Sequence, residues 1–107
     1  MSQAAQTHDE QTLQQLREAG SDLSKPHEIN HWLYFPNQQA ADGAAPTLKT
    51  KGFKVVSIEQ QKAEWRLKAV KTMVPAPKDV AAATLLLEST ATTYGGEYDG
   101  WETQVVE

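Results

Sequence analysis

The sequence predicts an α+β domain in which a leading helix is followed by elements in the order βαββαβ. The segment HEINHWLYF (27–35) alternates between apolar and polar residues with the period of a β-strand. The segments 53–59 and 64–74 flank a short polar turn, as the two strands of a hairpin do. Between 78 and 93 the apolar residues instead follow helical spacing, directly after Pro77, a favoured first helical residue.

The N-terminal sequence predicts a short disordered segment and one helix. Residues 1–6 offer no side chain that could pack, so we expect them to be disordered and a single domain to occupy 7–107. The tetrapeptide THDE (7–10) matches a capping box. In this motif the Thr7 hydroxyl accepts from the backbone amide of Glu10, and the Glu10 carboxylate accepts from the backbone amide of Thr7. Gly20 is placed to end this helix in a left-handed conformation.

The second helix and the last strand each contain residues that disturb regular structure. Asn37 is expected to cap the helix, but Gly43 and Pro46 lie inside it. Because an interior proline costs about 3 kcal/mol and a glycine about 1 kcal/mol relative to alanine, we expect a break or kink there. The final strand is predicted at 97–106, and Gly100 within it predicts a β-bulge.

Two right-handed crossovers around a hairpin give a ferredoxin-like two-layer sandwich, with a four-stranded antiparallel sheet and helices on one face. The first and third strands then lie in the middle of the sheet, and the last strand pairs beside the first. If the apolar residues of 27–35 pack on the helices, the alternate residues of that strand stand on the open face of the sheet. The candidate partner-binding residues on that face are Trp32, Tyr34, Arg66 and Lys68.

Composition and charge exclude several classes of protein. The 107 residues have a net charge of −4 and include no cysteine, which removes disulfides, thiol nucleophiles and zinc–thiolate sites. No apolar stretch approaches the roughly 20 residues of a membrane helix, and a signal-peptide core is missing, so we expect a cytoplasmic location. The segment 49–71 holds seven basic and two acidic residues, a pattern typical of a solvated face or of a surface for an acidic partner.

The sequence does not contain the motifs expected for catalysis or for metal and cofactor binding. His27 and His31 are four residues apart, but on a strand this spacing separates their Cα atoms by about 13 Å, too far for one ion. There is no G-x-S-x-G nucleophile elbow, and the glycine pair at 95–96 is not followed by the lysine of a phosphate-binding loop. Glu97 and Asp99 have no further group to complete an acid–base site. We therefore expect no enzymatic activity, no metal and no cofactor.

Four short motifs resemble those of a known protein family. They are LREAGSD (16–22), INHWL (29–33), KGF (51–53) and GGEYDGW (95–101). In order and spacing they resemble the regulator of ribonuclease E activity B (RraB) family over about residues 13–101, and GSD and YDGW are the most specific parts. The resemblance implies a small bacterial regulator that is not an enzyme and that binds ribonuclease E, restraining its action on transcripts.

We expect the motif residues to maintain the fold rather than to bind a partner. Tyr98 and Trp101 are an odd number of residues apart, so a regular strand would place their rings on opposite faces, whereas a bulge at Gly100 would bring them to one face. In either case the tail should complete the core; the alternative is a recognition arm held out to a partner. The residues expected to be chiefly structural are Gly20, Ser21, Asp22, His31, Tyr98, Asp99, Gly100 and Trp101.

Three alternatives remain for the open face of the sheet. Its aromatic and arginine residues favour a protein-docking patch. Aromatics on the central strands also suit single-stranded RNA, whose affinity would depend on Arg66, Lys68 and Lys71, but the third strand lacks the glycine–aromatic signature of RNA-recognition modules. In the third alternative the N-terminal helix or a loop covers the face. We favour a protein partner, ribonuclease E, over RNA, and the oligomeric state stays open.

Overall fold

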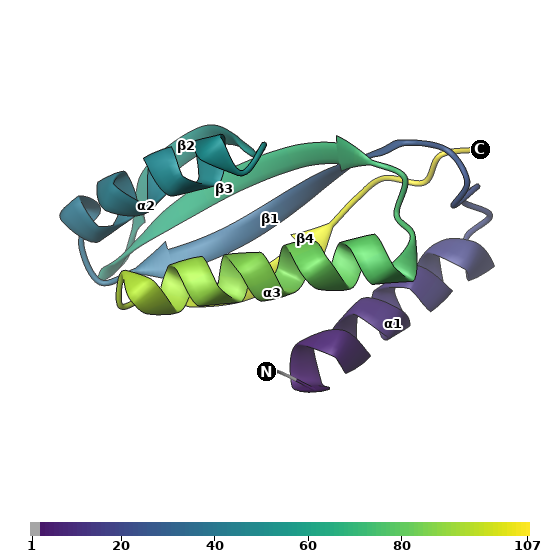
Figure 1. The fold of residues 1–107 in the computed structure, drawn as a ribbon, viewed down its shortest axis with the longest axis horizontal. Coiled ribbons are helices and arrows are strands. Elements are labelled where there is room, and N and C mark those ends of the chain that lie inside the picture. The colour runs from purple at the N-terminus through teal and green to yellow at the C-terminus, as the bar shows by residue number, and fades with distance from the viewer. Residues whose placement is uncertain (1–2) are drawn as a thin grey trace.

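The computed structural model describes residues 3–107, with the backbone alone for residues 3–8, and these residues form three helices and one sheet. The elements in Figure 1 are α1 (Gln3–Glu18), β1 (His27–Phe35), α2 (Gln38–Thr50), β2 (Lys54–Gln61), β3 (Glu64–Met73), α3 (Pro77–Thr93) and β4 (Glu97–Glu102). The sheet order is β2-β3-β1-β4, and each neighbouring pair is antiparallel. The predicted α+β fold, with an extra N-terminal helix and β1 and β3 in the centre, is confirmed.

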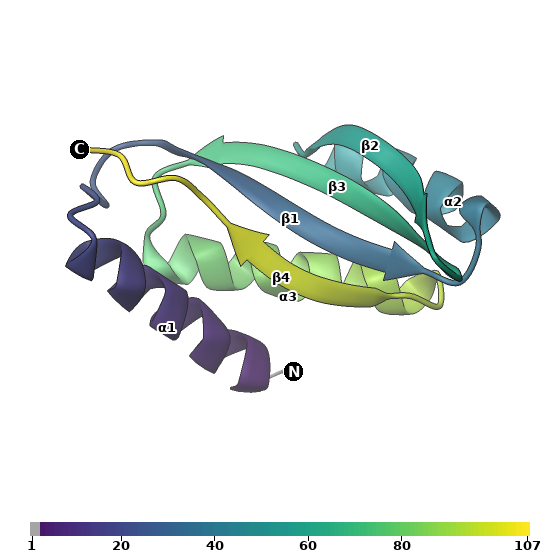
Figure 2. The ribbon, with the colours of Figure 1, turned by 180° about the vertical axis from the view of Figure 1, so that it is seen from behind.

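The helices lie on one side of the sheet. Helices α2 and α3 pack on the same face, and α1 packs beside α3 near the β4 edge (Figures 1 and 2). A first hydrophobic cluster, which includes Leu33, Phe35, Leu48, Leu67 and Leu87, fills the space between the sheet, α2 and α3. A second cluster joins α1 to α3 and the sheet through Leu13, Leu16, Ile29, Val80 and Trp101. Seen from behind, the opposite face of the sheet is covered by none of the three helices that residues 3–107 form (Figure 2).

Helix α1 begins earlier than the sequence predicts. It starts at Gln3, so Thr7 lies inside the helix instead of capping it, and residues 3–6 are helical although we expected disorder up to residue 6. Residues 1–2 of that expected disordered segment lie outside the described residues. Alanine and glutamine are good helix formers, which explains how the helix extends past the capping signal. Its C-terminus follows the prediction, because Gly20 has φ +91° and the next amide donates to the Leu16 carbonyl at 2.9 Å.

Helix α2 runs through both predicted helix breakers, so the expected break at these residues is wrong. A Cβ at Gly43 would lie 3.0 Å from the ring of Tyr94, which means that the glycine lets the residue that caps the C-terminus of α3 pack closely on α2. Pro46 lacks the amide that would bond the Asp42 carbonyl, but both residues are exposed, so water can satisfy that carbonyl. The predicted cap is confirmed, since Asn37 Oδ1 accepts from the Ala40 amide at 2.8 Å.

Strand β4 is shorter than the predicted 97–106, and the chain after it is held by other bonds. Thr103 donates through its hydroxyl to the Glu28 carbonyl at 2.7 Å. Further on, the Val106 amide donates to Ser21 Oγ at 3.0 Å, and the Val106 carbonyl accepts from the Asp22 amide at 2.6 Å. The tail therefore leaves the sheet after Glu102 and docks on the loop between α1 and β1.

Candidate functional site

The open face of the sheet brings together the four candidate partner-binding residues. Trp32 pairs with Lys68 across β1 and β3, and Tyr34 pairs with Arg66 two residues on. Residues paired across strands point to the same side of a sheet. Trp32 and Tyr34 are half-buried, while their neighbours on the helix side are fully buried. The alternative in which the N-terminal helix covers this face is wrong, because α1 packs on α3 and Trp101 on the helix side.

Cations surround the Trp32 ring. The Arg66 Cζ atom lies 4.8 Å from the ring centroid, and the Lys68 Nζ atom lies 5.2 Å from it. Arg66 also forms a salt bridge of 3.5 Å with Glu59 on β2. Each such cation–π contact contributes about 0.5–1 kcal/mol at an exposed site, and an exposed salt bridge about 0–1 kcal/mol. The stabilisation is modest, and these contacts bring Arg66 and Lys68 together with Trp32 on the open face.

The basic run of the sequence is divided between the two faces of the sheet. Lys71 pairs with Ile29, which faces the helices, and its ammonium lies 5.1 Å from the centroid of the Phe53 ring. Grouping Lys71 with Arg66 and Lys68 as one RNA-binding set is therefore wrong. An odd number of residues separates Lys71 from both other positions, which places it on the opposite side of β3.

The motif Gly20-Ser21-Asp22 fastens the tail of the chain. His27 is buried, and its Nδ1 lies 2.8 Å from the Lys25 carbonyl, so Nδ1 carries the proton. Its Nε2 then accepts from the Ser21 hydroxyl at 2.7 Å, and this same oxygen accepts from the Val106 amide. The Asp22 carboxylate accepts from the hydroxyl and amide of Ser24, and the hydroxyl bond is the main cause that lowers the pKa of Asp22.

The two aromatic residues of the motif from Tyr98 to Trp101 pack in the core, whereas Asp99 is exposed. The β1–β4 register shifts between Trp32 and Leu33, and Gly100 has φ +109°, so the predicted bulge is present. Both rings consequently face the helices. Trp101 is 6% exposed, and its indole donates to Asp9 Oδ1 at 2.7 Å.

The partner of Trp101 was not found from the sequence. Asp9 is 3% exposed, and its Oδ1 also accepts from the Thr84 hydroxyl at 3.1 Å, which joins α1 to α3. The sequence does indicate a role for Asp9, because Asp9, Leu13 and Leu16 share one face of the helix. A carboxylate on a face that is otherwise buried needs hydrogen-bond donors from other elements.

His31 and Tyr98 form a buried polar pair beside this cluster. Nδ1 of His31 lies 2.8 Å from the Tyr98 hydroxyl, and the imidazole meets the edge of Phe53 at 5.5 Å between ring centroids. Burial, with a smaller contribution from Lys71, lowers the pKa of His31 to about 4. Burial raises the pKa of Tyr98. Within residues 9–107, no three histidine, cysteine, aspartate or glutamate side chains converge as a metal site would require.

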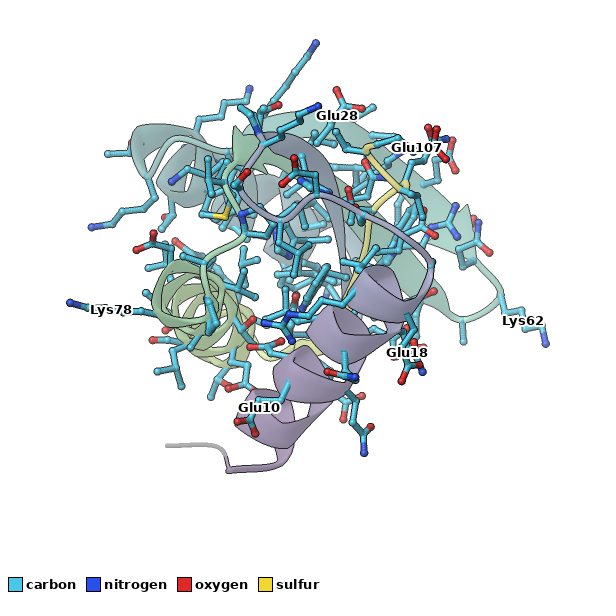
Figure 3. The ribbon with its side chains drawn as sticks, turned by 90° about the vertical axis from the view of Figure 1, so that its right-hand side faces the viewer. Glu10, Glu18, Glu28, Lys62, Lys78 and Glu107 are labelled. Carbon is cyan, nitrogen blue, oxygen red and sulfur yellow. The ribbon has the colours of Figure 1, made fainter. Side chains whose placement is uncertain are left out.

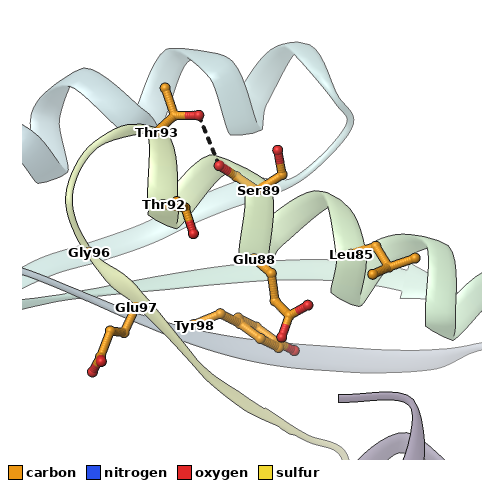
Figure 4. A pocket seen from close by; sticks show the side chains of 8 residues that line it. All are labelled: Leu85, Glu88, Ser89, Thr92, Thr93, Gly96, Glu97 and Tyr98. Carbon is orange, nitrogen blue, oxygen red and sulfur yellow. Dashed lines mark hydrogen bonds between the residues drawn. The ribbon is translucent and has the colours of Figure 1, made fainter. Parts of the chain in front are cut away.

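A shallow groove of about 860 Å³ runs between α3 and β4 (Figure 4). The Glu88 side chain points toward Tyr98 in this groove. The Thr93 hydroxyl donates to the Ser89 carbonyl at 2.9 Å and is thereby occupied. The residues that line the groove are Leu85, Glu88, Ser89, Thr92, Thr93, Gly96, Glu97 and Tyr98, and a histidine or lysine that could activate a hydroxyl is not among them. The described helices also lack one that is long and apolar enough to cross a membrane.

Comparison with known proteins identifies one family. The model of the RraB family, described as regulator of ribonuclease activity B, matches residues 6–103. A search of curated proteins gives no significant match. The matched segment covers all seven elements except the first residues of α1. The chain therefore belongs to the RraB family, and this membership implies a regulator of ribonuclease activity.

Proposed function

We propose that this protein binds ribonuclease E in the bacterial cytoplasm and restrains its cleavage of transcripts, without catalysing a reaction itself. Membership of the family supports the regulatory role. The choice of ribonuclease E rests on the resemblance of the motifs GSD and YDGW, and the family match does not specify it. The observation that carries the proposed binding mode is the group of Trp32, Tyr34, Arg66 and Lys68 on an uncovered sheet face.

These residue types suit a protein interface. Tryptophan, tyrosine and arginine dominate the residues whose truncation costs most at interfaces. Here the aromatic residues stand on a central strand, and Arg66 is held between Glu59 and the Trp32 ring. A surface that is ordered before binding loses less conformational entropy when the complex forms. The open face is therefore the surface of this molecule best suited to dock on a nuclease.

Single-stranded RNA is the second candidate ligand for this face. A base that stacks on Trp32 has to compete with two cations that already lie within 5.2 Å of the ring centroid. Glu59 neutralises part of the Arg66 charge, and Glu97 stands across the strand pair from Tyr34. Carboxylates on both sides of the aromatic centre repel a phosphate backbone. These contacts favour a protein partner over RNA.

An inhibition assay tests the proposed function. Purified ribonuclease E cleaves a fluorescent single-stranded RNA while wild-type protein, Trp32→Ala or Leu85→Ala is titrated. Leu85 is the matched control, because it is 39% exposed and lies on α3, away from the open face. Trp32→Ala should weaken binding by more than about 1 kcal/mol, or roughly fivefold in Kd, and Leu85→Ala should leave it unchanged.

The outcomes separate the proposals. Absence of inhibition by folded wild-type protein contradicts ribonuclease E as the target. Inhibition that Trp32→Ala leaves intact, with native far-UV circular dichroism, contradicts docking through the open face. Strong binding to bare RNA that falls steeply between about 0.05 and about 0.2 M salt, and that depends on Arg66 and Lys68, would support the RNA alternative.

A further inference from the structure

Strand β4 is an edge of the sheet, and a groove runs beside its free side. β4 pairs with β1 and with no other described strand, so alternate residues direct backbone groups away from the sheet without a partner strand. Helix α1 flanks the later half of β4, where Trp101 packs in one cluster with Leu13 and Leu16. The earlier half, at Glu97 and Tyr98, borders the groove of about 860 Å³, and α3 forms the other wall (Figure 4).

The shape of this groove suits an extended segment of chain. Its α3 wall runs from Leu85 to Thr93, about 12 Å along the helix axis, and about four extended residues span that length. A segment that adds to β4 directs alternate side chains toward α3 and toward the open side of the sheet. Recognition by strand addition combines backbone hydrogen bonds with such contacts of alternate side chains. Leu85, which is 39% exposed, supplies an apolar contact on the α3 wall.

A carboxylate stands on each side of this path. Glu88 points toward Tyr98 on the helix side, whereas Glu97 points away from Tyr98 (Figure 4). The register pairs Glu97 with Tyr34, a residue of the open face. Both glutamates line the groove, and no lysine, arginine or histidine is among the lining residues that the structure describes. A segment added to β4 therefore meets a negative charge on each of its two faces.

The surroundings remain acidic when the charges of the neighbouring elements are counted. Helix α3 and β4 together carry five carboxylates and one base, Lys78, which lies about 15 Å from Glu88 along the helix axis and projects away from the sheet (Figure 3). β1 adds Glu28 and neither lysine nor arginine. The described side chains of α1 add three carboxylates and one arginine, and α2 carries one acid and one base. Arg66 and Lys68 lie on β3, about 10 Å from β4, where salt at about 0.1 M screens much of their effect.

We propose that the groove and the free edge of β4 bind an extended, basic segment of a partner protein by strand addition. The backbone of the segment pairs with the outward groups of β4, and its lysine or arginine side chains meet Glu88 on one face and Glu97 on the other. The backbone bonds require an extended chain, and the carboxylates select a basic one. The register with β1 leaves out Asp99, so regular pairing is confined to the earlier half of β4 and the bound segment is short. This surface is separate from the open face that carries Trp32.

Three labelled peptides test the charge and the backbone separately. The probe is fluorescein-labelled TKKVKKT, which has lysines on both faces of an extended chain, and fluorescence anisotropy follows its binding to the full-length protein. The peptide TEEVEET keeps the backbone and reverses the charge. A form of TKKVKKT with every backbone amide N-methylated keeps the charge and removes the donors. These two peptides should each bind at least about tenfold more weakly than the probe.

Charge reversal in the protein locates the site. Glu88→Lys and Glu97→Lys should each weaken binding of TKKVKKT at least about fivefold, because each replaces an attraction with a repulsion. The matched control is Glu18→Lys, the same charge change at an exposed position at the C-terminal end of α1, and it should bind like wild type. Circular dichroism checks that each variant folds. If Glu88→Lys does not fold, Glu88→Gln should weaken binding in the same direction.

Amide hydrogen exchange identifies the strand that the peptide joins. Bound TKKVKKT should slow exchange at the outward amides of β4 and leave β2, the other edge strand, unchanged. Protection of β2 alone or of neither edge overturns the proposal, and so does equal binding of the N-methylated peptide, since charge alone would then explain the attraction. Failure of folded wild-type protein to bind TKKVKKT excludes a basic occupant.

Two further outcomes also decide against this occupant. Reversals at Glu88 and Glu97 that leave binding intact place the peptide elsewhere. Protection of β4 that rises with protein concentration in the absence of peptide assigns the edge to a second copy of this chain. No nuclease is present and Trp32 is unchanged throughout, so these results and those of the inhibition assay are independent of each other.

Discussion

The indole of Trp101 is expected to be one of the largest single contributions to the stability of this fold. It is 6% exposed, and it links β4 to α1 through a 2.7 Å bond to the Asp9 carboxylate. Trp101→Phe keeps most of the buried apolar surface but removes the N–H donor. A hydrogen bond to a charged group contributes about 1.5–3 kcal/mol, so this variant should lose about that much. Trp101→Ala also removes the ring, and the total loss should be about 3–5 kcal/mol.

These losses are measurable because small domains have little stability to spare. The free energy of unfolding of a folded domain is typically about 5–15 kcal/mol, so Trp101→Ala removes a large part of it. Urea denaturation followed by far-UV circular dichroism gives the free energies for wild type and both variants. In an Asp9→Asn background the bond loses its charge, and the effect of Trp101→Phe should fall to about 0.5–1.5 kcal/mol.

Two results would refute this reasoning. A loss below about 1 kcal/mol for Trp101→Ala would mean that the ring does not support the core. A chain that ends at Gly96, and so lacks β4, should be unfolded or aggregated. If this shortened chain melts cooperatively instead, the C-terminal segment is a recognition arm and the structural role assigned to YDGW is wrong.

Further predictions follow from other contacts. Gly96→Ala should lower the free energy of unfolding by more than about 2 kcal/mol in urea denaturation, because the added Cβ would collide with the Tyr34 carbonyl and the Phe35 ring. The control is Gly95→Ala, whose Cβ would meet open space and which is strained only by the φ of +75° at that position. The pKa of His31 is lowered from 6.5 to about 4, so below pH 6.5 the unfolded state binds a proton that the native state does not. The contribution of His31 to the free energy of unfolding should therefore decline by about 3 kcal/mol in all as the pH falls toward about 4. Urea melts of wild type and His31→Phe over that pH range should isolate this dependence, and identical pH profiles would contradict it. Ser21→Ala removes the acceptor of the Val106 amide and the donor to His27, and it should increase hydrogen exchange in the tail; unchanged exchange at Val106 would show that the tail is held by other contacts.

Local patterns predicted the sheet well because its strands alternate clearly between two environments. The alternation in HEINHWLYF gave both the bounds of β1 and the faces of its residues, and Gly100 gave the bulge. The residues of the open face could be predicted because side chains alternate between the two faces along β1 and β3. This alternation places Trp32 beside Arg66 and Lys68, as expected. The same alternation was not applied to Lys71, which was grouped with Arg66 and Lys68 for RNA binding although it lies on the other side of β3.

Predictions failed where the outcome depends on contacts between distant segments. The break expected in α2 did not occur, since Tyr94 packs on Gly43 and solvent reaches the backbone beside Pro46. The end of β4 at Glu102 reflects bonds from the tail to Ser21 and Asp22, which no local pattern records. Asp9 was missed for the same reason, because its donors come from α3 and β4.

The bonds that fasten the tail also set the order of events during synthesis. Trp101 bonds a residue 92 positions earlier, and Val106 bonds one 85 positions earlier. The ribosome releases α1 and β1 first, so these elements have no β4 to pack against until the last residues of the chain are synthesised. Until then β1, a central strand in the finished sheet, has one edge with unpaired backbone groups. Long-range pairing of this kind slows folding relative to helical proteins of similar size. Translation and closure of the sheet are therefore successive steps, and a chain stalled before Glu97 exposes the strand edge at which aggregation begins and chaperones act.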